Sequence, residues 1–273
     1  MFRQMTYRSI RSIFPVLVLA AWSLSSCQKV VNIDLNEASP KLVIEGVITD
    51  SIGPYTVKLT QSGSFYTPQV PVAVTGAFVS ISDDIGLTDT LKELYPGLYF
   101  TSILQGVPGH TYHLKVISGN KEYDAESSMM SHVNIDSLVL ETVDRLNRRY
   151  QTGTYGITCY FQDPPDEKNH YRTMMYVGDS LTNDRYRLYN DQYTNGEDIN
   201  LRVGTASAGD TIRVLLYSLD QSTYDYYRTL NDILDINPFF GSTPANPNTN
   251  LSNGALGYFG AFAISRAQLI VPK

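Results

Sequence analysis

The sequence predicts an all-β protein of two β-sandwich-like modules, the second of which carries one C-terminal α-helix. Short segments with alternating apolar and polar residues recur along the chain, and turns rich in Gly, Pro, Asp and Asn separate them. No amphipathic helix of useful length precedes residue 220. The chain has 273 residues, of which 42% are hydrophobic and 18% charged, so it can bury one large core or two of ordinary size.

Residues 1–26 have the layout of a bacterial signal peptide. A basic start with three arginines and no acid precedes a mostly apolar run, 13–22, about half the length that crosses a bilayer. The Leu-Ser-Ser-Cys sequence that ends at Cys27 resembles a lipobox, in which the signal is cut before the cysteine and the thiol is acylated. The resemblance implies a lipidated tether over 27–40 and a place at the cell outer membrane. It leaves open whether the protein faces the periplasm or the cell surface.

Charge and cysteine content exclude two classes of protein. The formal net charge is −6, and the chain after residue 26 carries −9, which argues against a nucleic-acid partner. Cys27 and Cys159 are the only cysteines, so the chain has no disulfide framework. As the one thiol outside the lipobox, Cys159 is expected to be buried and inert.

The first module is predicted over 41–130 and is immunoglobulin-like in its pattern. Tyr55, Val57 and Leu59 fall on one face of an alternating run, and a Gly-Asn turn at 119–120 joins two runs into an antiparallel hairpin. Its strand-like runs are 41–49, 55–60, 77–82, 112–117 and 121–126.

The second module is predicted over 131–273. Thirteen of the 20 tyrosines lie at or after Tyr150, which marks a change of composition. The run at 256–264 is expected to be a strand packed into this module. The other strand-like runs of the module are 135–141, 156–161, 171–177 and 211–219.

A helix is predicted over 222–235. Ser222 is the expected N-cap, with Asp225 three residues on, and Pro238 lies just beyond the end. One apolar face is expected to dock the helix on the second module. This face comprises Tyr224, Tyr227, Leu230, Ile233 and Leu234.

Seven short motifs keep a consistent order after the lipobox. They are KLVIEG (41–46), GAFVSISD (76–83), PGLY (96–99), GHTY (109–112), YDYY (224–227), NPF (237–239) and GALGYF (254–259). Together they resemble domain of unknown function 4249, a family of Bacteroidetes outer-membrane lipoproteins. The resemblance implies an accessory to a TonB-dependent transporter and supplies no catalytic motif. The first module is also similar to transthyretin-like regulatory domains, through its Gly-Ala-x-Val and Gly-x-Tyr elements.

No catalytic, metal or cofactor constellation stands out in the sequence. His110 and His113 are three residues apart on a strand, which puts them on opposite faces. The acids of the 163–167 loop are expected to form a solvated turn rather than a calcium site. No nucleophile elbow or phosphate loop is present. The chain is therefore predicted to have no enzymatic activity and no cofactor.

Tyrosines are the candidate partner surface, because tyrosine is enriched at interfaces. Tyr186, Tyr189 and Tyr193 lie in a polar stretch, and Tyr226 points away from the apolar face of the predicted helix. The leading hypothesis is a non-catalytic outer-membrane accessory protein that binds a transporter or captures a ligand for one. The alternatives are a stand-alone adhesin or glycan-binding module and, third, a hydrolase with an unrecognised site.

Overall fold

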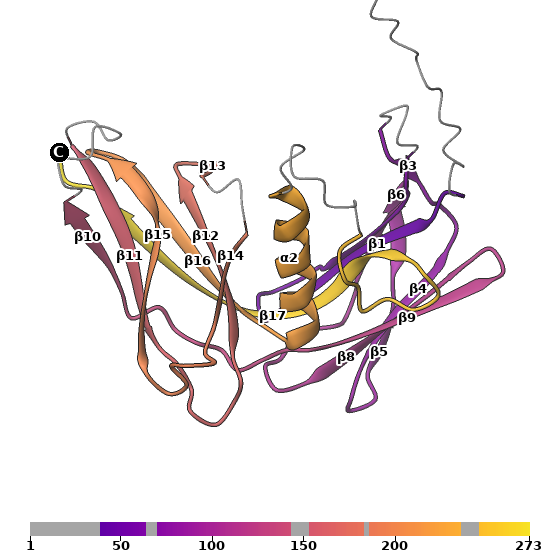
Figure 1. The fold of residues 1–273 in the computed structure, drawn as a ribbon. Coiled ribbons are helices and arrows are strands. Elements are labelled where there is room, and N and C mark those ends of the chain that lie inside the picture. The colour runs from indigo at the N-terminus through magenta and orange to yellow at the C-terminus, as the bar shows by residue number, and fades with distance from the viewer. Residues whose placement is uncertain (1–38, 64–69, 143–152, 183–185, 236–245) are drawn as a thin grey trace, which may run out of the picture. The chain divides into compact units, whose positions relative to one another are not determined.

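The computed structural model describes residues 39–63, 70–142, 153–182, 186–235 and 246–273 (Figure 1). The predicted signal peptide 1–26, Cys27 and most of the 27–40 tether lie outside the described residues. Residues 39–273 form one compact unit. Strands dominate that unit, so the all-β prediction is confirmed. In the described part of the chain, no helix is both long and apolar enough to cross a membrane.

Strands β1 to β9 build the first half of the unit from two sheets. One contains β1-β2-β7-β6 with β3 beside β2, and the other has the order β5-β4-β8-β9. Apolar residues alternate inward, as in β1, where Leu42, Ile44 and Ile48 are buried. The strands are β1 (Leu42–Thr49), β2 (Thr56–Gln61), β3 (Val72–Ala73), β4 (Phe78–Asp83), β5 (Thr88–Thr90), β6 (Lys92–Tyr95), β7 (Leu98–Phe100), β8 (Thr111–Ser118) and β9 (Lys121–Ser128). The predicted β8–β9 hairpin with its Gly-Asn turn is confirmed.

The second half again places sheet against sheet around a separate core. Strands β10-β11-β15 form one sheet, and β13-β12-β16-β17 continue the large sheet, with β14 beside β12. Ile157, Phe161, Val203 and Val214 are among the residues of its buried core. The strands are β10 (Ser137–Thr142), β11 (Thr154–Gln162), β12 (His170–Val177), β13 (Ser180–Leu181), β14 (Arg187–Asn190), β15 (Asp198–Ser207), β16 (Thr211–Leu219) and β17 (Leu256–Ile270).

Strand β17 belongs to both halves. Its first part pairs in parallel with β1, from Val43↔Leu256 to Thr49↔Phe262, and its second part pairs antiparallel with β16. Figure 1 shows this strand running from the first half into the second within the one large sheet. The sequence pattern predicted that this strand packs into the second module. That prediction was incomplete, because Phe259 and Ala261 lie in the first core. Gly257 permits the pairing: its φ is +93°, and a Cβ would lie 2.1 Å from the Ile44 carbonyl oxygen.

Helix α2 (Gln221–Leu234) lies within one residue of the predicted helix at each end. The N-cap is Asp220 and not Ser222, because the Asp220 carboxylate accepts the Thr223 N–H at 2.8 Å. The docked face is narrower than predicted: Tyr227 is buried, while Leu234 is half exposed. Packing of the helix against β12, β14 and β17 therefore depends mainly on its tyrosines.

Asp220→Ala should lower the free energy of unfolding by about 1–2 kcal/mol, since it removes the helix cap. The same carboxylate also accepts the Ser127 hydroxyl at 2.8 Å and the Ser128 N–H at 3.2 Å, so the loss reaches beyond the helix. Urea unfolding measures the effect. Asp232→Ala, on the exposed side of α2, is the matched control and should change stability by less than about 0.5 kcal/mol. Equal costs for the two variants would contradict the capping role.

Candidate functional site

Of the four tyrosines predicted as a partner surface, only Tyr193 is largely exposed, at 87%. Tyr189 is partly buried and hydrogen-bonds through its hydroxyl to the Thr194 hydroxyl. Tyr186 and Tyr226 belong to an aromatic cluster on the inner side of α2. The expected exposure of Tyr226 is wrong, and burial raises the pKa of its hydroxyl to about 12.

The aromatic cluster surrounds Arg172. The guanidinium carbon lies 4.4 Å from the ring centroid of Tyr227 and 4.6 Å from that of Tyr186. Tyr226 and Tyr258 stack beside them, 4.6 Å between ring centroids. Rings and cation together hold α2 on the sheet. Tyr186 and Tyr226 therefore take part in packing and are only partly exposed, whereas the prediction placed them on a partner surface.

Among the described residues no three His, Cys, Asp or Glu side chains converge on a possible metal position. His110 and His113 contact separate carboxylates, those of Asp84 and Glu126. Cys159 is buried as predicted, and burial raises the pKa of its thiol to about 12.

The 163–167 loop is in part the solvated turn that the sequence suggested, because Pro165 and Asp166 are exposed, but Asp163 departs from it. Asp163 is fully buried. Its carboxylate accepts the Tyr171 hydroxyl at 2.5 Å and the Gly196 N–H at 2.9 Å. Buried carboxylates need such partners, so this acid ties the loop to the second core rather than serving a ligand.

A shallow hollow lies on the outer face of the β5-β4-β8-β9 sheet. Its volume is about 530 Å³. Hydroxyl, charged and imidazole side chains line it, with Leu114 and Ala125, and no Phe, Tyr or Trp side chain is among them. The lining residues are Ser80, Ser82, Thr88, His113, Leu114, Lys115, Asp124, Ala125 and Glu126. The hollow therefore lacks the stacking platform that the glycan-binding alternative requires.

The feature that the structure does assemble is a group of exposed aliphatic side chains at one end of the first half. We call it the aliphatic apex. Three loops supply it, at 50–55, 84–87 and 101–110. Its members are between 39% and 93% exposed and are Ile52, Ile85, Leu87, Ile103 and Val107.

Hydrogen bonds hold the three loops together. The Gln105 side-chain amide donates to the carbonyls of Ser51 and Asp50, at 3.2 and 3.4 Å. His110 Nδ1 lies 2.7 Å from the Asp84 carboxylate, which joins the second loop to the third. The hydrogen bond from His110 is the main cause that lowers the pKa of Asp84.

Asp89 in β5 fixes the loop that carries Ile103. Its carboxylate is 2% exposed and accepts the backbone N–H groups of Ser102, Ile103 and Leu104, at 2.7 to 2.9 Å, together with the Ser102 hydroxyl. Burial alone would raise the pKa of Asp89, but these hydrogen bonds together hold it below its ordinary value. The backbone of Ile103 is therefore rigid while its side chain faces solvent.

The hydroxyl groups of two buried tyrosines hydrogen-bond to the same loop. The Tyr55 hydroxyl accepts the Gly106 N–H at 3.1 Å and donates to the Ser51 carbonyl at 2.5 Å. The Tyr112 hydroxyl accepts the Val107 N–H at 2.7 Å. Gly106 has no room for a side chain, because a Cβ there would lie 2.2 Å from the Thr49 carbonyl oxygen. These contacts constrain the conformation of the loop.

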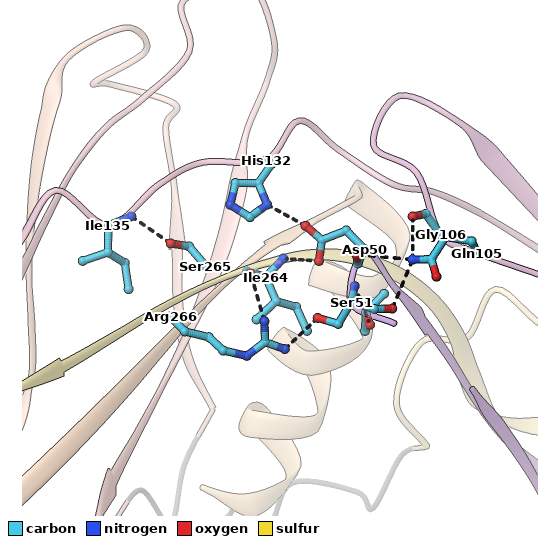
Figure 2. A network of polar contacts seen from close by, with 10 residues as sticks. Asp50, Ser51, Gln105, Gly106, His132, Ile135, Ile264, Ser265 and Arg266 are labelled. Carbon is cyan, nitrogen blue, oxygen red and sulfur yellow. Dashed lines mark hydrogen bonds and ion pairs between the residues drawn. The ribbon is translucent and has the colours of Figure 1, made fainter. Parts of the chain in front are cut away.

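A polar network joins the base of the apex to β17 (Figure 2). The Asp50 carboxylate accepts the Ile264 N–H at 3.1 Å and lies 2.5 Å from His132 Nδ1. The Arg266 guanidinium donates to the Ser51 hydroxyl at 2.7 Å. The loop that carries Ile52 is therefore attached to the long shared strand as well as to its neighbours.

Strand and helix patterns do not mark the apex, although the sequence carries another signal for it. Ile52 stands between Ser51 and Gly53, and Ile85 stands between Asp84 and Gly86. Turn residues flank both isoleucines, so neither belongs to an alternating strand face. Large aliphatic residues inside turns are candidates for exposure, and here they are exposed.

The family assignment comes from sequence comparison. A family model described as Domain of unknown function (DUF4249) matches residues 28–268. The chain belongs to this family. No curated protein matches the DUF4249 chain. Among solved structures it is similar to the chicken interferon gamma receptor alpha chain, with 10% identity over 66% of this chain and 90% of that chain and a TM-score of 0.20. This likeness gives the DUF4249 chain no function.

Proposed function

We propose that this chain is a non-catalytic outer-membrane lipoprotein that serves as an accessory to a TonB-dependent transporter or captures a ligand for one. An acylated Cys27 holds it to the membrane, and the aliphatic apex is its contact with the partner. The lipobox sequence supports the anchor. One observation carries the proposal: five exposed aliphatic side chains stand on loops that hydrogen bonds hold in place.

Rigid display favours binding for a physical reason. Groups of exposed aliphatic side chains are typical of interaction sites. A loop that is already ordered loses little conformational entropy when a partner covers it. Asp89, Tyr55 and Tyr112 supply that order before any partner arrives.

Replacement of both Ile52 and Ile103 by serine should reduce the amount of co-purified β-barrel partner at least tenfold. The apex then loses apolar area, while the hydrogen bonds that hold its backbone remain. The measurement is quantitative mass spectrometry after gentle detergent extraction of the tagged full chain. Ile270→Ser is the matched control, since Ile270 is 65% exposed at the end of β17 and Ile103 is 64% exposed. A wild-type preparation that contains no β-barrel protein would contradict the partner proposal. So would an equal loss of the co-purified partner in the Ile270→Ser control.

Cys27→Ala should abolish lipid attachment and move the protein to the soluble fraction, because the acylated thiol is the proposed anchor. Incorporation of labelled palmitate and membrane fractionation measure the two effects. Cys159→Ser, which changes the other thiol, should leave both unchanged. Labelling that persists in Cys27→Ala would refute the anchor.

A further inference from the structure

A second group of exposed apolar side chains lies at the opposite end of the first half from the apex. We call it the tether-side patch. Its members are Val70, Val72, Leu94 and Tyr95, each between 58% and 89% exposed. Strand pairing places them together at the edge of the large sheet: Val72 is in register with Gln61, and Gln61 with Leu42.

The turn after Tyr95 packs onto the same edge. The Leu59 N–H donates to the Gly97 carbonyl at 2.8 Å, and the Leu59 carbonyl accepts the Val74 N–H at 3.0 Å. A Cβ on Gly97 would lie 3.0 Å from that of Ala73. The turn that follows Leu94 and Tyr95 therefore lies beside the strand that carries Val72.

The chain enters the fold at this end. Two hydrogen bonds pin Lys41 to Ser62: the Lys41 N–H donates to the Ser62 hydroxyl at 2.9 Å, and the Ser62 N–H donates to the Lys41 carbonyl at 2.9 Å. Residues 28–38 separate the proposed lipid-bearing Cys27 from Ser39. That stretch spans at most about 40 Å when fully extended. The tether-side patch is thus the end that reaches a bilayer with the least extension of the tether.

We propose that the tether-side patch lies against the lipid surface and fixes the orientation of the protein on the membrane, with the apex directed away. This inference rests on the proposed lipid anchor. Aliphatic side chains with a tyrosine, whose ring is apolar and whose hydroxyl is polar, suit the boundary between headgroups and acyl chains. Four side chains bind a bilayer weakly by themselves, but the anchor raises their local concentration at the surface.

The test uses the position of a single tryptophan. The only native tryptophan is Trp22, which precedes Cys27 and is absent from the cleaved protein. Tyr95→Trp reports on the tether-side patch, and Leu94→Trp is a second reporter in the same strand. Ile52→Trp, at a position 93% exposed in the apex, is the matched control. Each full-length variant is purified in its lipidated form and reconstituted into phosphatidylcholine vesicles with brominated acyl chains.

Flotation with the vesicles measures the anchor, and quenching by bromine measures contact with lipid. We expect all variants to float, and the tryptophan at 95 or 94 to be quenched at least twofold more than the one at 52. Flotation without preferential quenching at 94 and 95 overturns the orientation and leaves the anchor standing. Stronger quenching at 52 overturns it too and assigns the apex to lipid. Failure to float overturns both the anchor and this inference.

Discussion

Phe259→Ala should lower the free energy of unfolding by about 3–5 kcal/mol, as is typical for removal of a fully buried phenylalanine. Phe259 in β17 is fully buried in the first core. Its ring lies over Gly46, the residue with which it is in register in β1. Asn250 binds both backbone groups of Phe259, at 3.1 and 2.8 Å, so the backbone cannot shift to fill the space left by the ring.

Urea unfolding of the variant, followed by far-ultraviolet circular dichroism, measures this loss. Gln268→Ala is the control in the same strand, because Gln268 is exposed, and it should change stability by less than about 0.5 kcal/mol. Since β17 serves both cores, we expect one transition for the whole unit. A loss below about 1 kcal/mol for Phe259→Ala would contradict the assignment of this strand to the first core.

Asp89→Ala should cost about 3 kcal/mol or more, because a buried donor left without an acceptor costs about 1–3 kcal/mol and three backbone N–H groups lose theirs. These donors belong to Ser102, Ile103 and Leu104. Thermal and urea unfolding measure the loss. Thr90→Ala, at the next and exposed position of β5, should stay within about 0.5 kcal/mol of wild type. A cost for Asp89→Ala as small as that of Thr90→Ala would show that the loop does not depend on this carboxylate.

The contribution of Asp89 also depends on pH. Its pKa is lower in the folded than in the unfolded chain, so its ionised form stabilises the fold. That contribution is complete above the unfolded pKa, near pH 4, and is lost as pH falls through the lower folded pKa. The difference in unfolding free energy between wild type and Asp89→Asn should therefore shrink below about pH 4. A constant difference from pH 7 down to pH 2 would contradict this mechanism.

Local patterns predicted the strands well. The run at 211–219 matches β16 residue for residue, and Tyr55, Val57 and Leu59 all face the core as their alternation indicated. Alternation of buried and exposed residues arises from the pleat of each strand, so the sequence of a single strand is enough to show it. The pairing of β1 with β17 depends on residues far apart in sequence, and no local pattern encodes it.

Side-chain exposure was harder to predict than strand position. A helical projection places Tyr226 away from Tyr227, yet its ring reaches sideways to stack on Tyr258 of β17. Asp89 lies in a three-residue strand of polar residues, where no periodicity marks a buried position. Alternation does not reveal the apex because its isoleucines lie in turns, where polar residues are usual. For Tyr226 and Asp89, a contact from another element decides the exposure.

The double membership of β17 also shapes how the chain can fold. About 200 residues separate β1 from its parallel partner, so this contact forms late and closes a very large loop. Until then β1 presents an unpaired edge to other chains, which is a route to aggregation. The ribosome synthesises β1 long before β17. The first half of the unit can therefore complete its fold only after the second half has been synthesised. A chaperone that shields the β1 edge in the interval would act at the most vulnerable stage of its biogenesis.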